Sequence, residues 1–368
     1  MTTRTLKTDI YQSLEELPIV VNEFWQEQSR HDYFIGRSWF DNFINNVANQ
    51  DGSVRIYVVT HGEDGVQAIL PLWIKSNTKY FGATRIVTSL SNYYSPYFRL
   101  ILNNSADAET TINELITHIK HDLAIWDAML LGPVDVCSVN NYLFVEALKK
   151  QGLSVKTYFA CANWIIDLND TDFTSYFKSR PSKLRHTYQR RQKKLAHDYQ
   201  FNIKVFSDLT DLEEAIADYQ TIYSKSWKVK EPYVNFIPNL IRTCAKDGVL
   251  RLGILYVNNI PAAAQIWILN RKSASIYKLA YDPLFKDYSV GTILTMYLAE
   301  RMITDEGMSR LDYLTGDDSY KKDWMNIRRE FMCIYVINKE NIRGRYLILK
   351  ENLSVLKNHL IFLTKLKF

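Results

Sequence analysis

The order of predicted helices and strands most constrains this fold, because the same order occurs twice along the chain. The first half contains two helical runs, strand-like runs, a helix, a buried strand and a helix that ends at a glycine. These runs lie at residues 14–28, 39–47, 54–62, 66–74, 110–123, 126–134 and 140–152.

The second half contains two helices, three strands, a helix and two further strands. These runs lie at residues 209–227, 236–248, 250–257, 261–269, 273–281, 290–307, 309–316 and 329–338. The turn at residues 257–261 predicts that the first two of the three strands form a hairpin. We interpret both halves as one pattern of helix, helix, three strands, helix and strand, although their sequences show no visible identity.

Length and composition agree with a duplicated architecture. The chain has 368 residues and is 47% hydrophobic, which suits two domains of ordinary size. The sequence therefore predicts an α/β (α+β) protein with two tandem domains, each a mixed central sheet flanked by helices. We place an N-terminal domain at residues 1–168, a basic helical linker at 169–200 and a C-terminal domain at 201–368.

Positive charge is concentrated between the two halves. Residues 180–194 contain seven Lys or Arg side chains and no acid, whereas the whole chain has a net charge of +5, so the remainder sums to −2. Such a segment can bind phosphate, carboxylate or nucleic acid, or it can be a solvated linker helix. We take Lys183 and Arg185 as candidate substrate-binding residues.

A loop that turns directly into a helix follows the strand ending at Tyr281. The segment Lys286-x-x-Ser289-x-Gly291 precedes the helix at 290–307. The free N–H groups at a helix start suit a pyrophosphate, and a glycine lets the backbone approach it closely. The alternative interpretation is a routine helix N-cap by the serine hydroxyl.

The stretch "RLDYLTGDDSYKKDWM" ends a strand in a cluster of charged and aromatic side chains. Ligands of open α/β sheets lie beyond the carboxyl ends of strands. Asp312 lies inside this strand, and we expect it to form a buried ion pair with the basic helix or with Lys278. The alternative interpretation is that Asp317 or Asp318 caps the following helix and that Trp324 is a packing residue.

These segments together resemble the GCN5-related N-acetyltransferases (GNAT), and more narrowly the CelD/BcsL type that is related to FemAB peptidyltransferases. The loop resembles the GNAT pyrophosphate loop, with Lys286 in place of Arg or Gln and Ser289 in place of the first Gly. The strand end matches the type's Asp-x-x-x-Gly-Asp, Tyr-Lys and Trp pattern. The matching positions are Asp312, Gly316, Asp317, Tyr320, Lys321 and Trp324.

The resemblance covers residues ~170–340 and implies an acyltransferase that uses acetyl-CoA or another acyl-CoA. It implies that coenzyme A binds Lys286, Ser289, Val290, Gly291 and Thr292 in the second half, because the first half has no glycine in the corresponding loop. Asp317 would then be the base or amine anchor and Tyr320 the acid that protonates the thiolate. Lys321 would bind an acidic group of the acceptor.

The acceptor would be a small molecule, a sugar or a lipid precursor, bound between the halves. Its candidate ligands are Lys183, Arg185, Lys278, Tyr281, Asp312 and Trp324. Two alternatives stay open: transfer of an aminoacyl group from a charged tRNA, as FemAB relatives do, and a non-catalytic binding module.

The remaining sequence features exclude some classes of protein. The four cysteines are far apart, and His118 and His121 have no third ligand nearby, so we expect no metal site and no disulfide framework. The N-terminus does not resemble a secretory signal, which predicts a cytoplasmic protein. The apolar, lysine-containing C-terminus is expected to pack on the protein, with peripheral membrane contact as the alternative.

Overall fold

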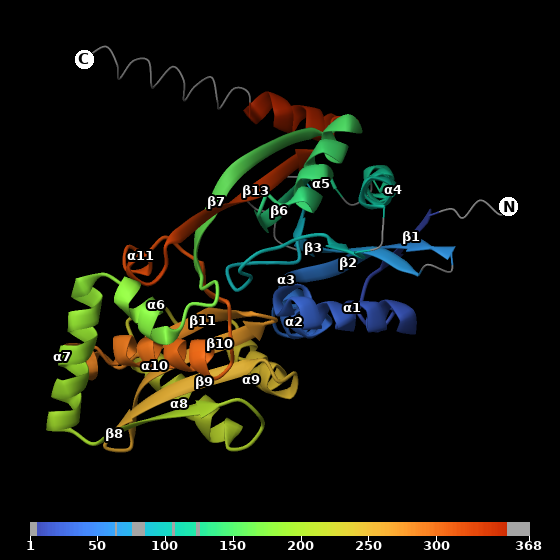
Figure 1. The fold of residues 1–368 in the computed structure, drawn as a ribbon. Helices are drawn as coiled ribbons and strands as arrows, with labels where there is room; N and C mark the ends of the chain where they lie inside the picture. Colours follow the sequence, from blue (N-terminus) through green and yellow to red (C-terminus); the bar gives the residue numbers. More distant parts are fainter. Residues whose placement is uncertain (1–5, 63–64, 76–84, 105–106, 123–125, 352–368) are drawn as a thin grey trace, which may run out of the picture. The chain divides into compact units, whose positions relative to one another are not determined.

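The computed structural model describes residues 6–62, 65–75, 85–104, 107–122 and 126–351. Contacts divide the described chain into two compact units, each built from separate stretches of sequence (Figure 1). The first unit comprises residues 6–27, 48–160 and 331–351, and the second comprises residues 28–47 and 161–330. This division differs from the predicted boundaries at 168 and 200, because residues 28–47 and 331–351 each join the unit made mainly by the other half.

The first unit contains a mixed sheet and the helices that cover it. Its strands are β1 (Leu6–Tyr11), β2 (Gly52–His61), β3 (Val66–Lys75), β4 (Ile86–Ser89), β5 (Ile101–Leu102), β6 (Ala128–Val134) and most of β13 (Ile327–Ile337). Its helices include the first part of α1 (Ile19–His31), α3 (Asn49–Asp51), α4 (Ala108–His121), α5 (Val139–Lys150) and a helix over residues 342–351.

The strands of the first unit pair in the order β1-β2-β3-β4-β6-β13, and β5 adds to β3. The pair β4–β6 is parallel, because α4 crosses over between these strands. Helix α4 begins at the N-cap Asp107, whose carboxylate accepts from the Thr110 N–H. It buries Ile112, Leu115, Ile116 and Ile119, the spacing of one helix face, which confirms the helix predicted there.

The second unit repeats this arrangement with its own elements. Its strands are the end of β7 (Ser154–Asp167), β8 (Phe201–Phe206), β9 (Leu250–Val257), β10 (Ile260–Asn270), β11 (Ser273–Tyr281) and β12 (Arg310–Thr315). Its helical elements include η1 (Tyr33–Ile35), α2 (Arg37–Phe43), η2 (Ile44–Ala48), α6 (Phe173–Ser179), α7 (Ser182–Asp198), α8 (Leu212–Lys225), α9 (Phe236–Lys246), η4 (Pro283–Tyr288), α10 (Val290–Thr304) and α11 (Lys321–Trp324).

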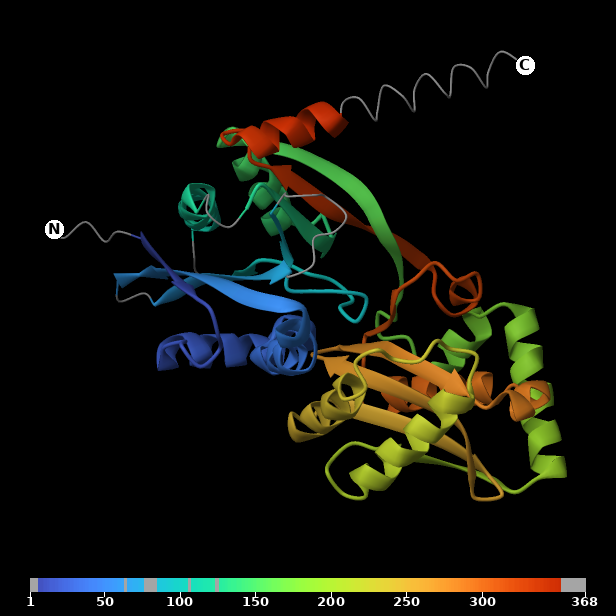
Figure 2. The ribbon, with the colours of Figure 1, turned by 180° about the vertical axis from the view of Figure 1, so that it is seen from behind.

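The strands of the second unit pair in the order β7-β12-β11-β10-β9-β8, and only β11–β12 is parallel. The predicted hairpin is confirmed as β9 and β10. Figure 2 shows α8 and α9 on one side of this sheet, and the buried helix α10 packs against β9, β10 and β11. The strands predicted at residues 54–62 and 66–74 are confirmed as β2 and β3, and those predicted at 250–257, 261–269 and 273–281 as β9, β10 and β11.

Two packing features hold the second unit together. A Cβ atom built on Gly253 of β9 would lie 2.8 Å from Cδ1 of Leu298, so the glycine admits the α10 side chain to the sheet. The α2 side chain Trp39 packs edge-on against Phe236 of α9 at 5.7 Å and Phe34 of η1 at 5.3 Å. These aromatic contacts explain why residues 28–47 belong to the second unit.

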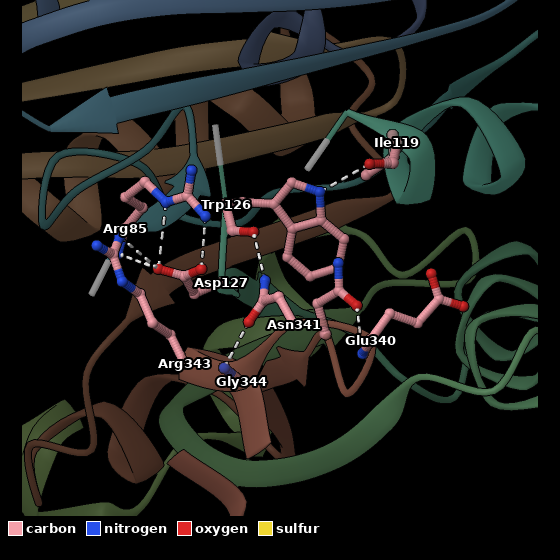
Figure 3. A network of polar contacts seen from close by, with 9 residues as sticks. Arg85, Ile119, Trp126, Asp127, Glu340, Asn341, Arg343 and Gly344 are labelled. Atoms are coloured by element: carbon pink, nitrogen blue, oxygen red, sulfur yellow. Dashed lines mark hydrogen bonds and ion pairs between the residues drawn. The ribbon is translucent and has the colours of Figure 1, made fainter. Parts of the chain in front are cut away.

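A buried carboxylate fixes the start of β6 in the first unit (Figure 3). Asp127 accepts from the backbone N–H of Arg85 at 2.8 Å and from its Nη2 at 2.7 Å. Nη1 of Arg343 lies 3.9 Å from Oδ2, the oxygen that accepts from the Arg85 N–H. Burial raises the pKa of the Asp127 carboxyl, but the hydrogen bonds from Arg85 outweigh it and hold the pKa below its usual value.

We predict that Asp127→Asn lowers the free energy of unfolding at pH 7 by about 1–3 kcal/mol, because Arg85 loses its charged acceptor. A carboxyl with a lowered pKa in the folded state stabilises above its unfolded pKa and stops doing so as the pH falls through its folded pKa. The difference between variant and wild type should therefore shrink below about pH 4. Urea denaturation across pH checks this, with Asp9→Asn, a surface partner of Lys7, as the matched control expected to change by about 0.5 kcal/mol or less.

Candidate functional site

The parallel strands β11 and β12 separate at their carboxyl ends. They pair only over Ser273–Ser275 and Arg310–Asp312. Beyond that point β11 continues to Tyr281 on β10, and β12 continues to Thr315 on β7 with a bulge between Asp312 and Thr315. Leu314, inside this bulge, has a φ of 50°. The two strands therefore diverge after Ser275 and Asp312.

Asp312 holds the bulge in place. Its Oδ1 accepts from the Leu314 N–H at 2.7 Å and from Nδ2 of Asn163 at 2.6 Å. Arg329 donates to Oδ1 of Asn163 and lies 3.7 Å from the Asp312 carboxylate. Burial raises the pKa of Asp312, and the Arg329 charge opposes that shift. The predicted ion pair with the basic helix or Lys278 is wrong, because Arg329 and Asn163 occupy this carboxylate.

Lys278 faces a different partner from the one predicted. Its Nζ lies 2.7 Å from Oε1 of Glu231, and the Tyr223 hydroxyl donates to the same carboxylate at 2.6 Å. Glu231 belongs to the segment that joins α8 to α9. A substrate-binding role for Lys278 therefore includes Glu231 as part of the same charged pair.

The loop before α10 has the backbone form that glycine usually supplies. Ser289 adopts the left-handed conformation, with φ 51° and ψ 43°, and its side chain makes no capping hydrogen bond. The N-cap interpretation of this serine is therefore wrong. Since the family pattern has glycine here, the backbone conformation, rather than the hydroxyl, is the shared feature.

A buried amide side chain from β10 holds the first turn of α10 in position. Gln265 of β10 donates to the Gly291 carbonyl at 3.1 Å and to Oγ1 of Thr295 at 2.7 Å. Its own Oε1 accepts from Nε1 of Trp267 at 2.9 Å. The Val290 side chain is buried in the core, so only its backbone N–H can serve a ligand. The first N–H groups of a helix have no acceptor within that helix, and they form a site for an anion.

The basic segment forms helix α7, which packs against this loop. Arg191 donates to the Asp287 carbonyl, and the Tyr288 hydroxyl donates to Asp198 at 2.9 Å. Nζ of Lys194 lies 4.7 Å from the Tyr288 ring centre. The segment is thus a structural support of the loop rather than only a solvated linker.

The other candidates on the basic segment and the loop occupy different environments. Lys183 is exposed on α7, and Nε of Arg185 donates to the Arg180 carbonyl at 3.1 Å. Lys286 lies within η4, and the left-handed Ser289 directly follows the end of η4. Thr292 lies in the first turn of α10.

Two predicted site residues are parts of the core at the end of β12. Lys321 is 4% exposed, and its Nζ donates to the Thr315 carbonyl at 2.6 Å and the Tyr313 carbonyl at 3.2 Å. Burial lowers the pKa of Lys321. Trp324 is 5% exposed, and its carbonyl accepts from Nη1 of Arg180 at 2.6 Å. Lys321 is thus tied to the end of β12, and the Trp324 side chain is part of the core.

Asp317 and Tyr320 follow β12 and differ in their surroundings. Asp317 accepts from Nη2 of Arg328 at 2.7 Å and from Nε1 of Trp164 at 2.9 Å. The hydrogen bonds from Arg328 lower the pKa of Asp317 to about 2, which makes this carboxylate a weak base. Tyr320 is 41% exposed, and burial of its hydroxyl region raises its pKa to about 12. It therefore carries its proton at neutral pH.

Sequence reasoning missed the segment directly after α8. The Trp227 ring lies 4.6 Å from the Tyr281 ring, and Tyr281 is also the nearest side chain to Gly291, with 3.5 Å between its Cδ1 and a Cβ built on the glycine. Burial lowers the pKa of Lys228, and the charge on Lys278 lowers it further. No motif or periodicity distinguishes this lysine in the sequence.

Charged groups that belong to or follow both separated strands act on the Lys228 amine. Besides Lys278 of β11, its pKa is affected by Asp318 and Lys321, which follow β12. Within the described residues, its Nζ has no hydrogen-bond or ion-pair partner, and it lies 5.9 Å from the Trp227 ring centre. A partly buried amine among other charges is a candidate for proton transfer or for binding an anion.

Two absences concern the described residues alone. No group of three His, Cys, Asp or Glu side chains among them is placed to hold a metal ion. None of the helices in this part of the chain combines the length and apolar character needed to span a bilayer.

Comparisons with known proteins agree with the geometry of the second unit. Residues 182–322 match the family model described as Acetyltransferase (GNAT) domain. FemX superposes with a TM-score of 0.60 at 12% identity, over 90% of this chain and 98% of FemX. A conserved protein of unknown function from Bacteroides thetaiotaomicron has a TM-score of 0.57 at 12% identity, over 90% and 100% of the two chains.

A third similar structure is L-PGS from Bacillus licheniformis, with a TM-score of 0.51 at 11% identity, over 85% of this chain and 95% of L-PGS. A search of curated proteins gave no match. The chain thus has the GNAT fold and contains a GNAT acetyltransferase domain. The narrower CelD/BcsL type stays a prediction, since these identities show the fold alone.

We predict that the bulge depends on the Asp312 acceptor oxygen more than on its charge. Asp312→Ala removes both hydrogen bonds to Oδ1 and should lower the free energy of unfolding by about 1–3 kcal/mol. Asp312→Asn keeps one acceptor oxygen and should cost less. Urea denaturation measures both, and Asp318→Asn, on an exposed side chain, is the control. Equal losses in the Ala and Asn variants would instead assign the effect to the carboxylate charge.

Proposed function

We propose that this protein is an acyl-CoA-dependent acyltransferase, with acetyl-CoA as the expected donor and an amine or hydroxyl as the acceptor. The observation that carries the proposal is the separation of β11 from β12 beside the first turn of α10. In this arrangement the N–H groups of α10 would receive the phosphate, and the thioester would lie between the separated strands. The GNAT match over residues 182–322 supports the same reaction class.

The pyrophosphate of coenzyme A would bind the N–H groups of Val290, Gly291 and Thr292, with Lys286 supplying a positive charge. Ser289 contributes its left-handed backbone, which directs those N–H groups toward one point. Gln265 keeps the turn in position through the Gly291 carbonyl. The donor site is then held by β10 and by α7, which supports η4.

The reaction forms a bond from the acceptor nitrogen or oxygen to the acyl carbon and breaks the carbon–sulfur bond of the thioester. The nucleophile loses a proton and the thiolate gains one. Tyr320 is our candidate for the acid, because its raised pKa keeps it protonated and its side chain is partly exposed. Asp317 becomes an anchor for Arg328 and Trp164 in place of the base first considered.

Lys228 is our candidate for the base. A neutral amine can take a proton, and burial favours the neutral form of lysine. Trp227 directly precedes this lysine and packs against Tyr281, and the charges of the Lys278–Glu231 pair act on its pKa. These side chains would bind the acceptor, a small molecule, a sugar or a lipid precursor.

The donor is tested directly by titrating the purified protein with acetyl-CoA in a calorimeter and by following thiol release without an added acceptor. Saturable binding with slow hydrolysis supports the proposal. Transfer from aminoacyl-tRNA with no binding of acetyl-CoA would support the alternative donor, and binding of neither would support a module without this chemistry.

We predict that Gly291→Val weakens acetyl-CoA binding roughly tenfold or more, since loss of hydrogen bonds to a charged group costs about 1.5–3 kcal/mol. The branched side chain would crowd the N–H groups that receive the phosphate. Gly291→Ala is the matched control, because its Cβ would make an ordinary 3.5 Å contact with Tyr281. Unchanged affinity in the valine variant, measured by calorimetry, would place the phosphate elsewhere.

We predict that Lys228→Arg lowers kcat by roughly 10²–10⁴-fold, the usual contribution of a general base, while acetyl-CoA affinity stays within about twofold. Arginine keeps the positive charge but does not lose its proton at these pH values. Because burial lowers the pKa of Lys228, kcat of the wild type should rise with pH at a lower pH than an ordinary lysine would give. Steady-state kinetics over pH measures both effects.

The conservative variant separates two roles for this lysine. Near-normal kcat in Lys228→Arg together with a large rise in acceptor KM in Lys228→Met would make it an anion-binding residue instead of a base. Lys225→Arg, on the last turn of α8 and in an ion pair with Asp282, is the control for changing a nearby lysine.

A further inference from the structure

The helix over residues 342–351 in the first unit has two opposite apolar faces. Its inner face is buried, with Leu347 at 3% exposure in a cluster with Ile86, Ala128, Tyr335 and Ile337. Its outer face carries Ile342, Tyr346 and Leu349, which are 85%, 61% and 58% exposed. Spacings of four and three residues place these three side chains on one side of the helix. We call them the C-terminal stripe.

The helix that carries the stripe is fixed near both ends. At its start, Oδ1 of Asn341 accepts from the Gly344 N–H at 2.6 Å, and Nδ2 of Asn341 donates to the Trp126 carbonyl at 3.4 Å (Figure 3). At its other end, Glu351 forms an ion pair with Lys156 at 2.5 Å. The apolar stripe is therefore presented to solvent by an anchored helix, while the other apolar face is already used.

Positive charges flank the stripe. Arg343, Arg345 and Lys350 are exposed beside it. Apolar side chains flanked by cationic ones are typical of helices that lie in a membrane interface.

We propose that the C-terminal stripe binds the surface of an anionic lipid membrane. Insertion of Ile342, Tyr346 and Leu349 would remove apolar surface from water, and the flanking cations would contact lipid phosphates. A second copy of the chain fits less well. Two stripes packed together would bring Arg343, Arg345 and Lys350 of each copy near like charges at the flanking positions that set coiled-coil pairing.

The test is flotation of the full-length protein with vesicles of phosphatidylcholine alone and of phosphatidylcholine with 30% phosphatidylglycerol, about one-third anionic lipid. We expect binding to the anionic vesicles, weaker at high salt. Tyr346→Glu with Leu349→Glu should reduce partitioning at least about tenfold, the value of burying one large apolar side chain. Arg345→Gln and Lys350→Gln should each reduce it roughly fivefold at low salt.

The matched control is Val139→Glu with Tyr142→Glu, which changes two exposed apolar side chains on α5 of the same unit. This variant should bind vesicles as the wild type does. Absence of binding to anionic vesicles, or binding unaffected by the Tyr346 and Leu349 changes, would overturn the proposal. So would a dimer in light scattering that those changes convert to a monomer, because the occupant would then be a second copy.

Discussion

The second unit depends on one irregularity, the bulge that ends the pairing of β11 with β12. A parallel pair that continued to the ends of both strands would leave no space between them. Asp312 prevents this by accepting from the Leu314 N–H, which turns the backbone into the left-handed region. The buried carboxylate is itself tolerated only because Asn163 and Arg329 satisfy it. The separation of the two strands thus depends on a satisfied polar network around Asp312.

The charges around the gap explain why so few of the predicted site residues are free to act. Lys321 donates a hydrogen bond to the Thr315 carbonyl at the end of the bulge, and Asp317 accepts one from Arg328. Lys278 is neutralised by Glu231. Lys228 is placed among these groups without a partner of its own in the described structure, so protein stability does not account for its burial. A role in binding or proton transfer is the simpler explanation.

The spacing of apolar residues predicted most helices and strands, but it did not predict which neighbour each strand pairs with. The strands β2 and β3 before α4, the three strands before α10 and both central helices follow from patterns of apolar residues. The ends of β7 and β13 do not, because an alternating pattern is the same whichever neighbour a strand pairs with. The segment after α8 was missed for a similar reason. Trp227 contacts Tyr281, and the Lys278 charge lowers the pKa of Lys228, but both partners are far away in the sequence.

The end of β7 and the start of β13 both belong to the second unit and contribute side chains to the site. β7 pairs with β12 and brings Asn163 and Trp164 to it, while Arg328 and Arg329 begin β13. All four side chains lie outside residues 182–322, the range of the GNAT match, and yet they fix Asp312 and Asp317. A fragment limited to the matched range would keep the loop before α10 and lose the groups that hold the bulge open. The smallest piece that preserves this geometry must therefore include both strands that border the match.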